Sequence, residues 1–269
     1  MRTIVHLSDL HFGRVNARLV EPLVKSISEI SPDLIAVSGD LTQRARSHQF
    51  LEARAFLDRL PKPQIVVPGN HDIPLHNIYA RFVGRLAKYR RYITDDLQPV
   101  YADEEMIVIG VNTARSLTFK GGRINELQVT GLRDKLCARE DQVIKAVVTH
   151  HPFDLPEAHD ERDLVGRAQM AMVTLADCGA DLFLAGHLHI SHTGHTAKRY
   201  NIAGHSALVV QAGTATSTRG RGEANSFNVV RLDHLRISVE RFEWQPSIES
   251  FAVAGEEKFE RSSEGWVRI

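Results

Sequence analysis

Six short runs of apolar residues, rich in valine and isoleucine, constrain the fold of this chain more than any other feature of its sequence. Each run ends in polar residues or glycine, which is typical of buried strands. Four segments with a helical spacing of apolar residues lie among them. Because an alternation of strands and helices joins parallel strands by crossovers, the sequence predicts an α/β fold. The strand-like runs are 3–8, 34–39, 64–69, 106–112, 145–150 and 181–186, and the helical segments are 16–30, 46–60, 125–140 and 166–180.

The last third of the chain has a different pattern. Three further strand-like runs, 207–214, 226–232 and 235–244, follow one another with little room for helices, which indicates antiparallel strands. No linker and no internal repeat divides the sequence. We therefore expect a single domain over residues 1–269, built from two sheets packed together with helices outside.

Composition and charge narrow the class of protein. Hydrophobic residues make up 43% of the 269 residues and charged residues 25%, as in ordinary soluble globular proteins. Lys+Arg and Asp+Glu both total 33, so no overall charge indicates a nucleic-acid partner. No apolar segment approaches the ~20 residues needed to span a bilayer, and the first residues lack a secretion signal. We expect a cytoplasmic protein, in which Cys137 and Cys178 are small core residues in a reducing compartment.

Polar residues that can bind a metal follow five of the apolar runs. In open α/β sheets, ligands bind beyond the carboxyl ends of the strands, so these side chains are expected to converge. Asp40 directly follows a buried run, where an aspartate costs desolvation energy unless a positive group meets it. A shared cation would provide that group. The residues, in chain order, are Asp9, His11, Asp40, Asn70, His71, Asp72, His150, His151, His187 and His189.

The donor atoms of this set indicate which metals they would bind. Carboxylate and amide oxygens together with several imidazole nitrogens suit divalent Mn, Fe, Zn or Co. A magnesium or calcium site built from oxygen would not use so many histidines, and one tetrahedral zinc would not need so many ligands. Two divalent transition metal ions that share Asp40 fit the number of candidate ligands better. Their net positive charge suits a phosphate oxygen, as in two-metal hydrolysis.

Each of these short motifs also has an ordinary interpretation. A single D-x-H sequence is common by chance, and a G-D pair after a strand is commonly a turn. Five such elements at the ends of strands, in one order, make coincidence a poor explanation.

The ordered motifs resemble those of the calcineurin-like metallophosphoesterase family, whose pattern is D-x-H, G-D, G-N-H, H and G-H-x-H. The match runs from residue 9 to residue 189 without a missing position. The resemblance implies a four-layer α/β/β/α sandwich of two mixed sheets with a dinuclear metal centre. It implies that one metal is held by Asp9, His11 and His189, that the other is held by Asn70, His150 and His187, and that Asp40 bridges them.

By the same resemblance, His71 is not a ligand but contacts the scissile phosphate, where it stabilises developing charge or protonates the leaving group. His150 is preferred to His151 as the ligand because it comes first after its strand. Asp72 either orients the loop that carries Asn70 or forms a turn.

Departures from the family pattern indicate the branch. Protein serine/threonine phosphatases continue the G-D motif with Asp-Arg-Gly, whereas residues 41–43 here are Leu-Thr-Gln. Purple acid phosphatases need a tyrosine ligand shortly after the same aspartate, and none is present. Small bacterial phosphodiesterases that carry "GDLT" and "PGNHD" are similar to this chain, including cyclic-nucleotide and glycerophosphodiester hydrolases.

The resemblance therefore implies a metal-dependent phosphodiesterase that hydrolyses a small phosphodiester, such as a cyclic nucleotide, with a metal-bridging hydroxide. One alternative is a phospholipase C-like or glycerophosphodiester activity on lipid headgroups. Another is a non-catalytic metal-binding scaffold, against which the intact His71 and the full ligand set argue.

Two kinds of segment outside the motifs bear on the substrate. Residues 77–93 form a basic amphipathic pattern that favours either a helix covering the core or a peripheral contact with anionic lipid, and the former is preferred. Arg115, Arg219 and Arg221 lie in loops after strands and can each hold a phosphate oxygen. Arg115 is the first choice for substrate binding. The sequence assigns no oligomeric state.

Overall fold

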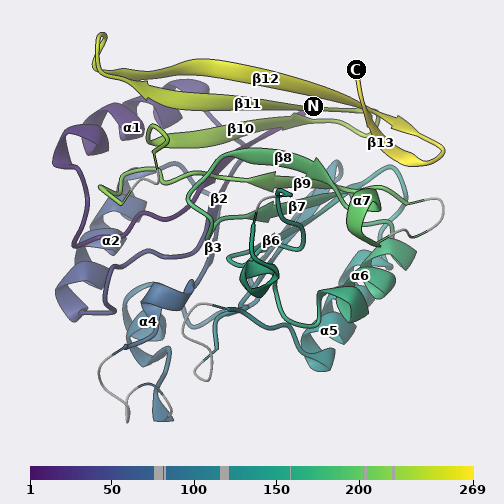
Figure 1. Ribbon diagram of the computed structural model, residues 1–269, viewed down its shortest axis with the longest axis horizontal. Helices are drawn as coiled ribbons and strands as arrows, with labels where there is room; N and C mark the ends of the chain where they lie inside the picture. Colours follow the sequence, from purple (N-terminus) through teal and green to yellow (C-terminus); the bar gives the residue numbers. More distant parts are fainter. Residues whose placement is uncertain are drawn as a thin grey trace.

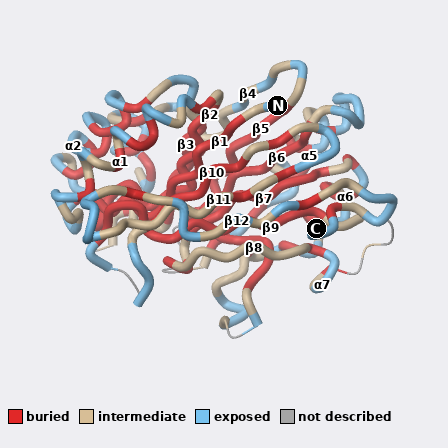
Figure 2. Tube along the Cα trace, turned by 90° about the horizontal axis from the view of Figure 1, so that it is seen from above, coloured by how far each residue is buried: buried red, intermediate tan, exposed pale blue. Residues whose placement is uncertain are grey.

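The computed structural model describes residues 1–75, 81, 83–115, 121–157, 159–200, 202, 205–219 and 222–269. Within them, two β-sheets pack face to face, and helices cover the outer face of each sheet (Figure 1). This arrangement confirms the predicted four-layer α/β/β/α sandwich of two mixed sheets. Figure 2 shows that the central strands of both sheets are buried along most of their length, while exposed residues lie mainly on the outer helices, the loops and the outer strands.

The first sheet joins the start of the chain to its end. Its strands follow the order β13-β12-β11-β10-β1-β2-β3. β1 pairs in parallel with β2, and β2 with β3, whereas β1, β10, β11, β12 and β13 form antiparallel pairs. The bounds are β1 Arg2–Leu7, β2 Leu34–Ser38, β3 Gln64–Val67, β10 Ser226–Leu232, β11 Arg236–Gln245, β12 Ser250–Ser262 and β13 Gly265–Arg268.

The second sheet is built from the middle of the chain, in the order β4-β5-β6-β7-β9-β8. Its four central strands are parallel, and β4 and β8 pair antiparallel at the two edges. The bounds are β4 Val100–Ala102, β5 Met106–Val111, β6 Ile144–Thr149, β7 Leu182–Ala185, β8 His192–His195 and β9 Leu208–Gln211.

Successive side chains of a strand point to opposite faces of its sheet. The core therefore has three parts: one between the two sheets, and one between each sheet and its helices. In β1, Val5 and Leu7 face the helices outside the first sheet, whereas Ile4 faces the second sheet. In β5, Val108 faces the first sheet and Ile109 faces the opposite helices. Because both faces of these strands are covered, successive residues are buried rather than every second one.

Among the described residues, the helices are α1 Ala17–Ile30, α2 Ser47–Arg59 and α4 Ala87–Tyr92 beside the first sheet, and α5 Glu126–Leu136, α6 Ala168–Asp177 and α7 Ala197–Tyr200 beside the second. Two short 3₁₀ turns, Asn70–Asp72 and Glu161–Asp163, lie in loops. α1 begins where predicted, because the side chain of Asn16 accepts a hydrogen bond from the backbone N–H of Arg18.

One expectation for the last third was wrong. The run 207–214 contains β9, which pairs in parallel with β7 in the second sheet instead of joining the antiparallel strands that follow it. The chain between β7 and β9 includes β8 and α7, so it is long enough to cross over and return in the same direction. The runs that contain β10 and β11 do form an antiparallel pair, as predicted.

The expectation of unpaired cysteines was also wrong, because Cys137 and Cys178 form a disulfide. Cys137 ends α5 and Cys178 ends α6, and these two helices pack side by side on the second sheet. The packing brings the two Cα atoms to 4.5 Å although 41 positions separate them in the sequence. The cysteines therefore no longer support a reducing compartment, and the cytoplasmic location stays a prediction.

Reduction of this disulfide is expected to lower the free energy of unfolding by about 2–4 kcal/mol, because an intact bond restricts the unfolded chain over a long loop. Urea unfolding with and without a phosphine reductant measures the change. A thiol titration of the untreated protein under denaturing conditions should find no free thiol. Two free thiols, together with identical unfolding midpoints, would contradict the bond.

The described part of the basic segment 77–93 packs on the core. Leu86, Tyr89 and Ile93 are buried against α2 and the first sheet, and the Tyr89 hydroxyl donates to the backbone oxygen of Val66. Ile78 and Phe82 lie outside the described residues. The buried apolar side chains favour the helix-covering interpretation, and lipid contact stays a prediction. Across the parts of the chain that the structure describes, we find no helix with the length and apolar character to cross a membrane.

Candidate metal centre

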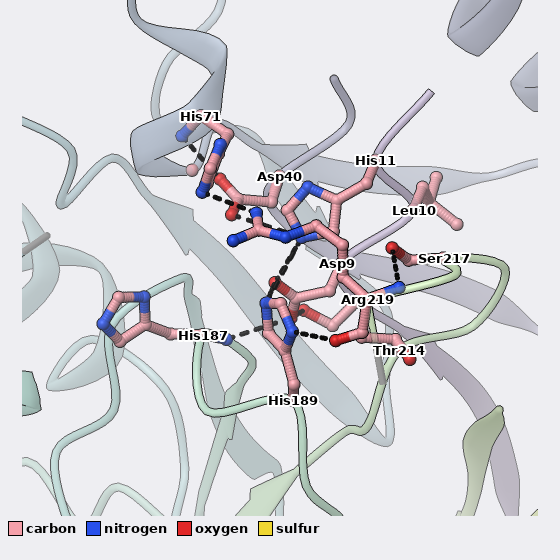
Figure 3. Close-up of polar contacts among 12 residues, drawn as sticks. Asp9, Leu10, His11, Asp40, His71, His187, His189, Thr214, Ser217 and Arg219 are labelled. Carbon is pink, nitrogen blue, oxygen red and sulfur yellow. Dashed lines mark hydrogen bonds and ion pairs between the residues drawn. The ribbon is translucent and has the colours of Figure 1, made fainter. Parts of the chain in front are cut away.

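The predicted ligands follow the carboxyl ends of β1, β2 and β3 in the first sheet and of β6 and β7 in the second. Figure 3 shows five of them, Asp9, His11, Asp40, His187 and His189. Four of them form one group, in which a ligand atom from each lies within 4.8 Å of the others. His150, His151 and His187 form a second such group. The members of the first group are Asp9, His11, Asp40 and His189.

In the first group, imidazole nitrogens converge on a carboxylate oxygen. Asp9 Oδ1 lies 3.1 Å from His189 Nε2 and 3.4 Å from His11 Nε2. The two Nε2 atoms lie 3.3 Å from each other. Asp9 Oδ1 is buried and accepts no hydrogen bond among the described residues. A buried carboxylate oxygen without a donor, facing two imidazole nitrogens, is an arrangement that a bound cation would satisfy.

The opposite oxygen of each carboxylate is held by hydrogen bonds. Asp9 Oδ2 accepts from the Ser8 hydroxyl at 2.7 Å and from the backbone N–H of His187 at 3.0 Å. Asp40 Oδ1 accepts from the backbone N–H of His71 at 2.8 Å. These contacts fix both carboxylates so that their other oxygens point toward the histidines.

Asp40 connects the two groups. Its Oδ2 lies 3.7 Å from His11 Nε2 and 3.5 Å from His150 Nε2. His150 Nε2 also lies 3.1 Å from the side-chain oxygen of Asn70. One carboxylate oxygen therefore faces an imidazole nitrogen from each group, as expected of a bridging ligand.

Hydrogen bonds at Nδ1 orient two of the histidines. His150 Nδ1 donates to the Ser38 carbonyl oxygen at 2.8 Å, and His189 Nδ1 donates to the Arg219 carbonyl oxygen at 3.3 Å. In a neutral imidazole this leaves the lone pair on Nε2, which is the atom that faces the carboxylates. His151 differs, because its Nδ1 contacts the Thr113 hydroxyl at 2.8 Å. Both histidines belong to the second group, and the choice of His150 as the ligand stays a prediction.

His187 is the member of the second group that follows β7. Its ring centroid lies 5.1 Å from that of His150 and 4.6 Å from that of His151. Its Nε2 lies 3.6 Å from a carboxylate oxygen of Asp163, a residue that the sequence analysis did not single out. Burial lowers the pKa of His187, which favours the neutral form that can bind a metal.

The backbone at the predicted ligands is unusual. Asp9, His11, Asp40, His187 and His189 all have φ angles between 51° and 74°, in the left-handed region that residues other than glycine seldom adopt. Such conformations cost free energy, and they cluster at functional sites where the surrounding structure holds them.

A close contact between the backbone of Gly69 and Asp40 explains why the G-N-H motif has glycine at this position. A Cβ atom at this position would lie 2.1 Å from Asp40 Oδ1 and 2.4 Å from the Asp40 backbone nitrogen. Only glycine lets the loop after β3 lie directly on the Asp40 carboxylate.

Gly69→Ala is therefore expected to displace the Asp40 carboxylate, to lower the free energy of unfolding by about 2 kcal/mol or more, and to reduce bound metal. Chemical unfolding and metal analysis by mass spectrometry measure both effects. Gly255→Ala is the matched control, because nothing lies within 4 Å of a Cβ atom placed there. Equal behaviour of the two variants would contradict the close approach.

The electrostatics of the two carboxyl groups favour ionisation despite burial. Burial acts to raise the pKa of Asp9, but His189 and His11 hold it well below its usual range. Burial likewise opposes ionisation of Asp40, and the neighbouring His150 outweighs it, so that its pKa is lowered. Both side chains are thus charged at neutral pH, as metal ligands must be.

Asp72 acts as a link between two loops. Its carboxylate accepts hydrogen bonds from the backbone N–H groups of Gly69, Leu41 and Thr42. Burial and the neighbouring Asp40 raise its pKa to about 6, although these N–H groups oppose the shift. Of the two interpretations from the sequence, orientation of the loop agrees with these contacts.

His71 lies beside the first group, with its ring centroid 5.0 Å from that of His11. Its Nδ1 donates to the backbone oxygen of Gln43 at 3.0 Å, and its Nε2 lies 3.1 Å from a guanidinium nitrogen of Arg219. Figure 3 shows the Arg219 side chain beside His71.

Arg115, the first choice for a substrate contact, has a different environment. Its guanidinium donates to the backbone oxygens of Asn112 and Ala114, and to the side chain of Gln128 at 2.5 Å. Burial, and then nearby arginines, lower its pKa to about 10. Its role stays a prediction. Arg221 lies outside the described residues.

Several supporting residues were not found from the sequence. Ser8 and Asp163 contact predicted ligands, and Gln43 contacts His71. Ser8 precedes Asp9 directly, so its position was the one available signal. Nothing in the sequence indicates that Asp163 approaches His187.

Comparison with known proteins bears on this geometry. Residues 2–191 match the family model described as calcineurin-like phosphoesterase. A protein of Synechococcus sp. named "Probable cyclic nucleotide phosphodiesterase" is 26% identical over 163 residues, which cover 56% of this chain and 58% of that protein. The glycerophosphodiester phosphodiesterase GpdQ of Enterobacter lignolyticus is 31% identical over 80 residues, covering 26% of this chain and 29% of that protein.

Solved structures share the fold at low sequence identity. Purple acid phosphatase PPD1 from yellow lupin has a TM-score of 0.71 at 12% identity, and the match covers 96% of this chain and 53% of that one. PhoD has a TM-score of 0.71 at 9% identity, covering 100% of this chain and 71% of that one. Together with the family match over residues 2–191, the observations show that this chain belongs to the calcineurin-like phosphoesterase family.

Proposed function

We propose that this protein is a dinuclear metal-dependent phosphodiesterase that acts on a small phosphodiester, with cyclic nucleotides as the leading substrate class. The observation that carries the proposal is the position of Asp40 Oδ2, which faces a histidine nitrogen from each of the two groups, at 3.7 and 3.5 Å. The substrate class is supported by the Synechococcus relative named for cyclic nucleotides.

The oxygen and nitrogen donors gathered here fit two divalent transition metal ions. Asp9, His11 and His189 would hold one, and Asn70, His150 and His187 the other, with Asp40 shared. Two bound cations would supply a Lewis-acid centre that polarises the phosphoryl oxygens and activates water. Mn, Fe, Zn and Co all suit these oxygen and nitrogen donors.

The chain's own residues would orient the substrate and handle a proton. His71 Nε2 points toward Arg219, and its Nδ1–H is fixed by the Gln43 carbonyl oxygen. With both ring nitrogens protonated, His71 would donate the Nε2 proton to the leaving oxygen of a phosphodiester seated at the centre and return to the neutral form with Nδ1–H still on Gln43. The Arg219 guanidinium would contact a non-bridging phosphate oxygen.

Removal and restoration of metal test the proposal. Protein stripped with a chelator is expected to lose hydrolysis of bis(p-nitrophenyl) phosphate, and added Mn²⁺ should restore it. Cyclic nucleotides and glycerophosphodiesters are then compared at equal concentration. A protein that takes up two metals per chain yet cleaves no diester with any of the four metals would overturn the proposal in favour of a scaffold.

Glycerophosphodiesters are the second candidate class, because GpdQ is named for them. Greater kcat/KM for glycerophosphodiesters than for every cyclic nucleotide would reverse the ranking.

A further inference from the structure

A cavity of about 440 Å³ lies next to the candidate metal centre. It is formed where the loops after β1 and β2 meet the loop before β10. Its lining includes Arg14, Arg44, Arg46, Arg219, Gln43 and Gln49, and no acidic residue.

The cavity concentrates positive charge in a protein whose formal net charge is zero. Among the described residues, none of its four arginines has a carboxylate within ion-pair distance. Arginines elsewhere commonly do, such as Arg54 with Asp58 and Arg199 with Asp154. Four cationic groups facing one space repel one another, and a bound anion would offset that repulsion.

The loop that carries two of the arginines is held in place. The side-chain oxygen of Gln49 accepts from the backbone N–H of Arg44 at 2.9 Å and of Arg46 at 3.4 Å. The side-chain nitrogen of Gln49 packs on Gly13, where a Cβ atom would lie 2.1 Å from it and where φ is +99°. The arginines are therefore presented on a fixed loop at the N-terminus of α2, whose dipole adds to the positive potential.

The cavity shares residues with the surroundings of His71. Arg219 and Gln43 line it, and both contact the His71 ring, at 3.1 Å from Nε2 and 3.0 Å from Nδ1. The cavity therefore adjoins His71, and a substrate whose scissile phosphate reaches His71 has room to extend its remaining part toward this arginine cluster.

We propose that the cavity binds a second phosphate group on the organic part of the substrate, so that the preferred substrate is a phosphodiester that already carries another phosphate. This inference rests on the proposed phosphodiesterase function. Guanidinium groups bind phosphate by paired hydrogen bonds, and a dianion gains more than a neutral group from four of them.

The test uses two esters that differ in one group. Thymidine 5′-(p-nitrophenyl phosphate) is compared with its 3′-phosphorylated form, using the Mn²⁺-loaded protein. We expect kcat/KM to be at least about 10-fold higher for the 3′-phosphorylated ester. In the double variant Arg44→Gln/Arg46→Gln, and separately in Arg14→Gln, this ratio should fall to within about 2-fold of one. Arg139→Gln removes an exposed arginine that lies outside the cavity lining, and should keep the ratio.

Binding provides a readout that does not require turnover. Titration calorimetry of the same proteins should show thymidine 3′,5′-bisphosphate binding at least about 10-fold more tightly than thymidine 5′-monophosphate, with the difference lost in the variants. A ratio near one in the wild-type protein, with both esters cleaved, overturns the second-phosphate site and leaves the phosphodiesterase standing. If neither ester nor any other diester is cleaved, the proposed function fails. Equal binding of the two nucleotides would then overturn the cavity assignment as well.

Discussion

Asp40→Asn is expected to lower kcat toward bis(p-nitrophenyl) phosphate by about 10³-fold or more, which corresponds to roughly 4 kcal/mol of transition-state stabilisation. Asp40 Oδ2 faces His11 on one side and His150 on the other. An amide in its place removes the negative charge that both cation positions would share. The asparagine side chain has an oxygen or a nitrogen where each carboxylate oxygen of Asp40 lies, so it still fits the space. The substitution therefore changes the charge of the site rather than its packing.

Metal content separates this explanation from a general loss of structure. Mass spectrometry should find two metal ions per wild-type chain and fewer in Asp40→Asn, with an unchanged circular dichroism spectrum. Asp134→Asn is the matched control, because Asp134 lies exposed on α5 and should keep both activity and metal. An Asp40→Asn protein with two bound metals and a kcat within about 10-fold of the wild type would contradict the bridging role.

The predictable part of the site is explained by local motifs. Asp9, Asp40 and His150 each come within two residues of the end of an almost completely buried strand, so that one rule about parallel sheets brings them together. The same rule does not depend on the exact ends of the strands, which differ from the expected runs by a residue or two. The pairing of ligands into two groups came from the family resemblance rather than from these patterns.

Other features depend on packing between distant segments and leave no local signal. The Cys137–Cys178 bond needs α5 and α6 to end side by side, which their individual periodicities do not reveal. The sequence of β12 mixes small, charged and apolar residues because much of it is exposed, so it lacks the apolar run that marked the inner strands. The direction of Arg115 is set by its contact with Gln128, 13 positions away on another element.

The arginine cavity depends both on residues close to a local motif and on packing between distant segments. Arg44 and Arg46 follow the G-D motif closely in sequence, yet their role depends on where Gly13 and Arg219 lie. Arg219 ranked below Arg115 in the sequence analysis. Its guanidinium lies 3.1 Å from His71 Nε2, which makes Arg219 a further substrate-binding candidate beside Arg115.

His71→Ala is expected to lower kcat by about 10²- to 10⁴-fold, the range for loss of a positioned acid or base. The imidazole lies beside the ligand groups but is held by Gln43 and Arg219, so its removal should leave the metal content unchanged. The backbone N–H of His71 still donates to Asp40 in this variant, so that the Asp40 carboxylate keeps its orientation.

The dependence on the leaving group shows what His71 does. If His71 protonates the leaving oxygen, the loss should be larger for a cyclic nucleotide, whose alkoxide needs a proton, than for p-nitrophenolate, which leaves readily without one. Equal losses for both substrates would instead indicate that His71 stabilises charge on the phosphoryl group. His48→Ala, on the exposed surface of α2, is the matched control and should change neither rate. Loss of bound metal in His71→Ala would contradict both roles, because it would make His71 a ligand.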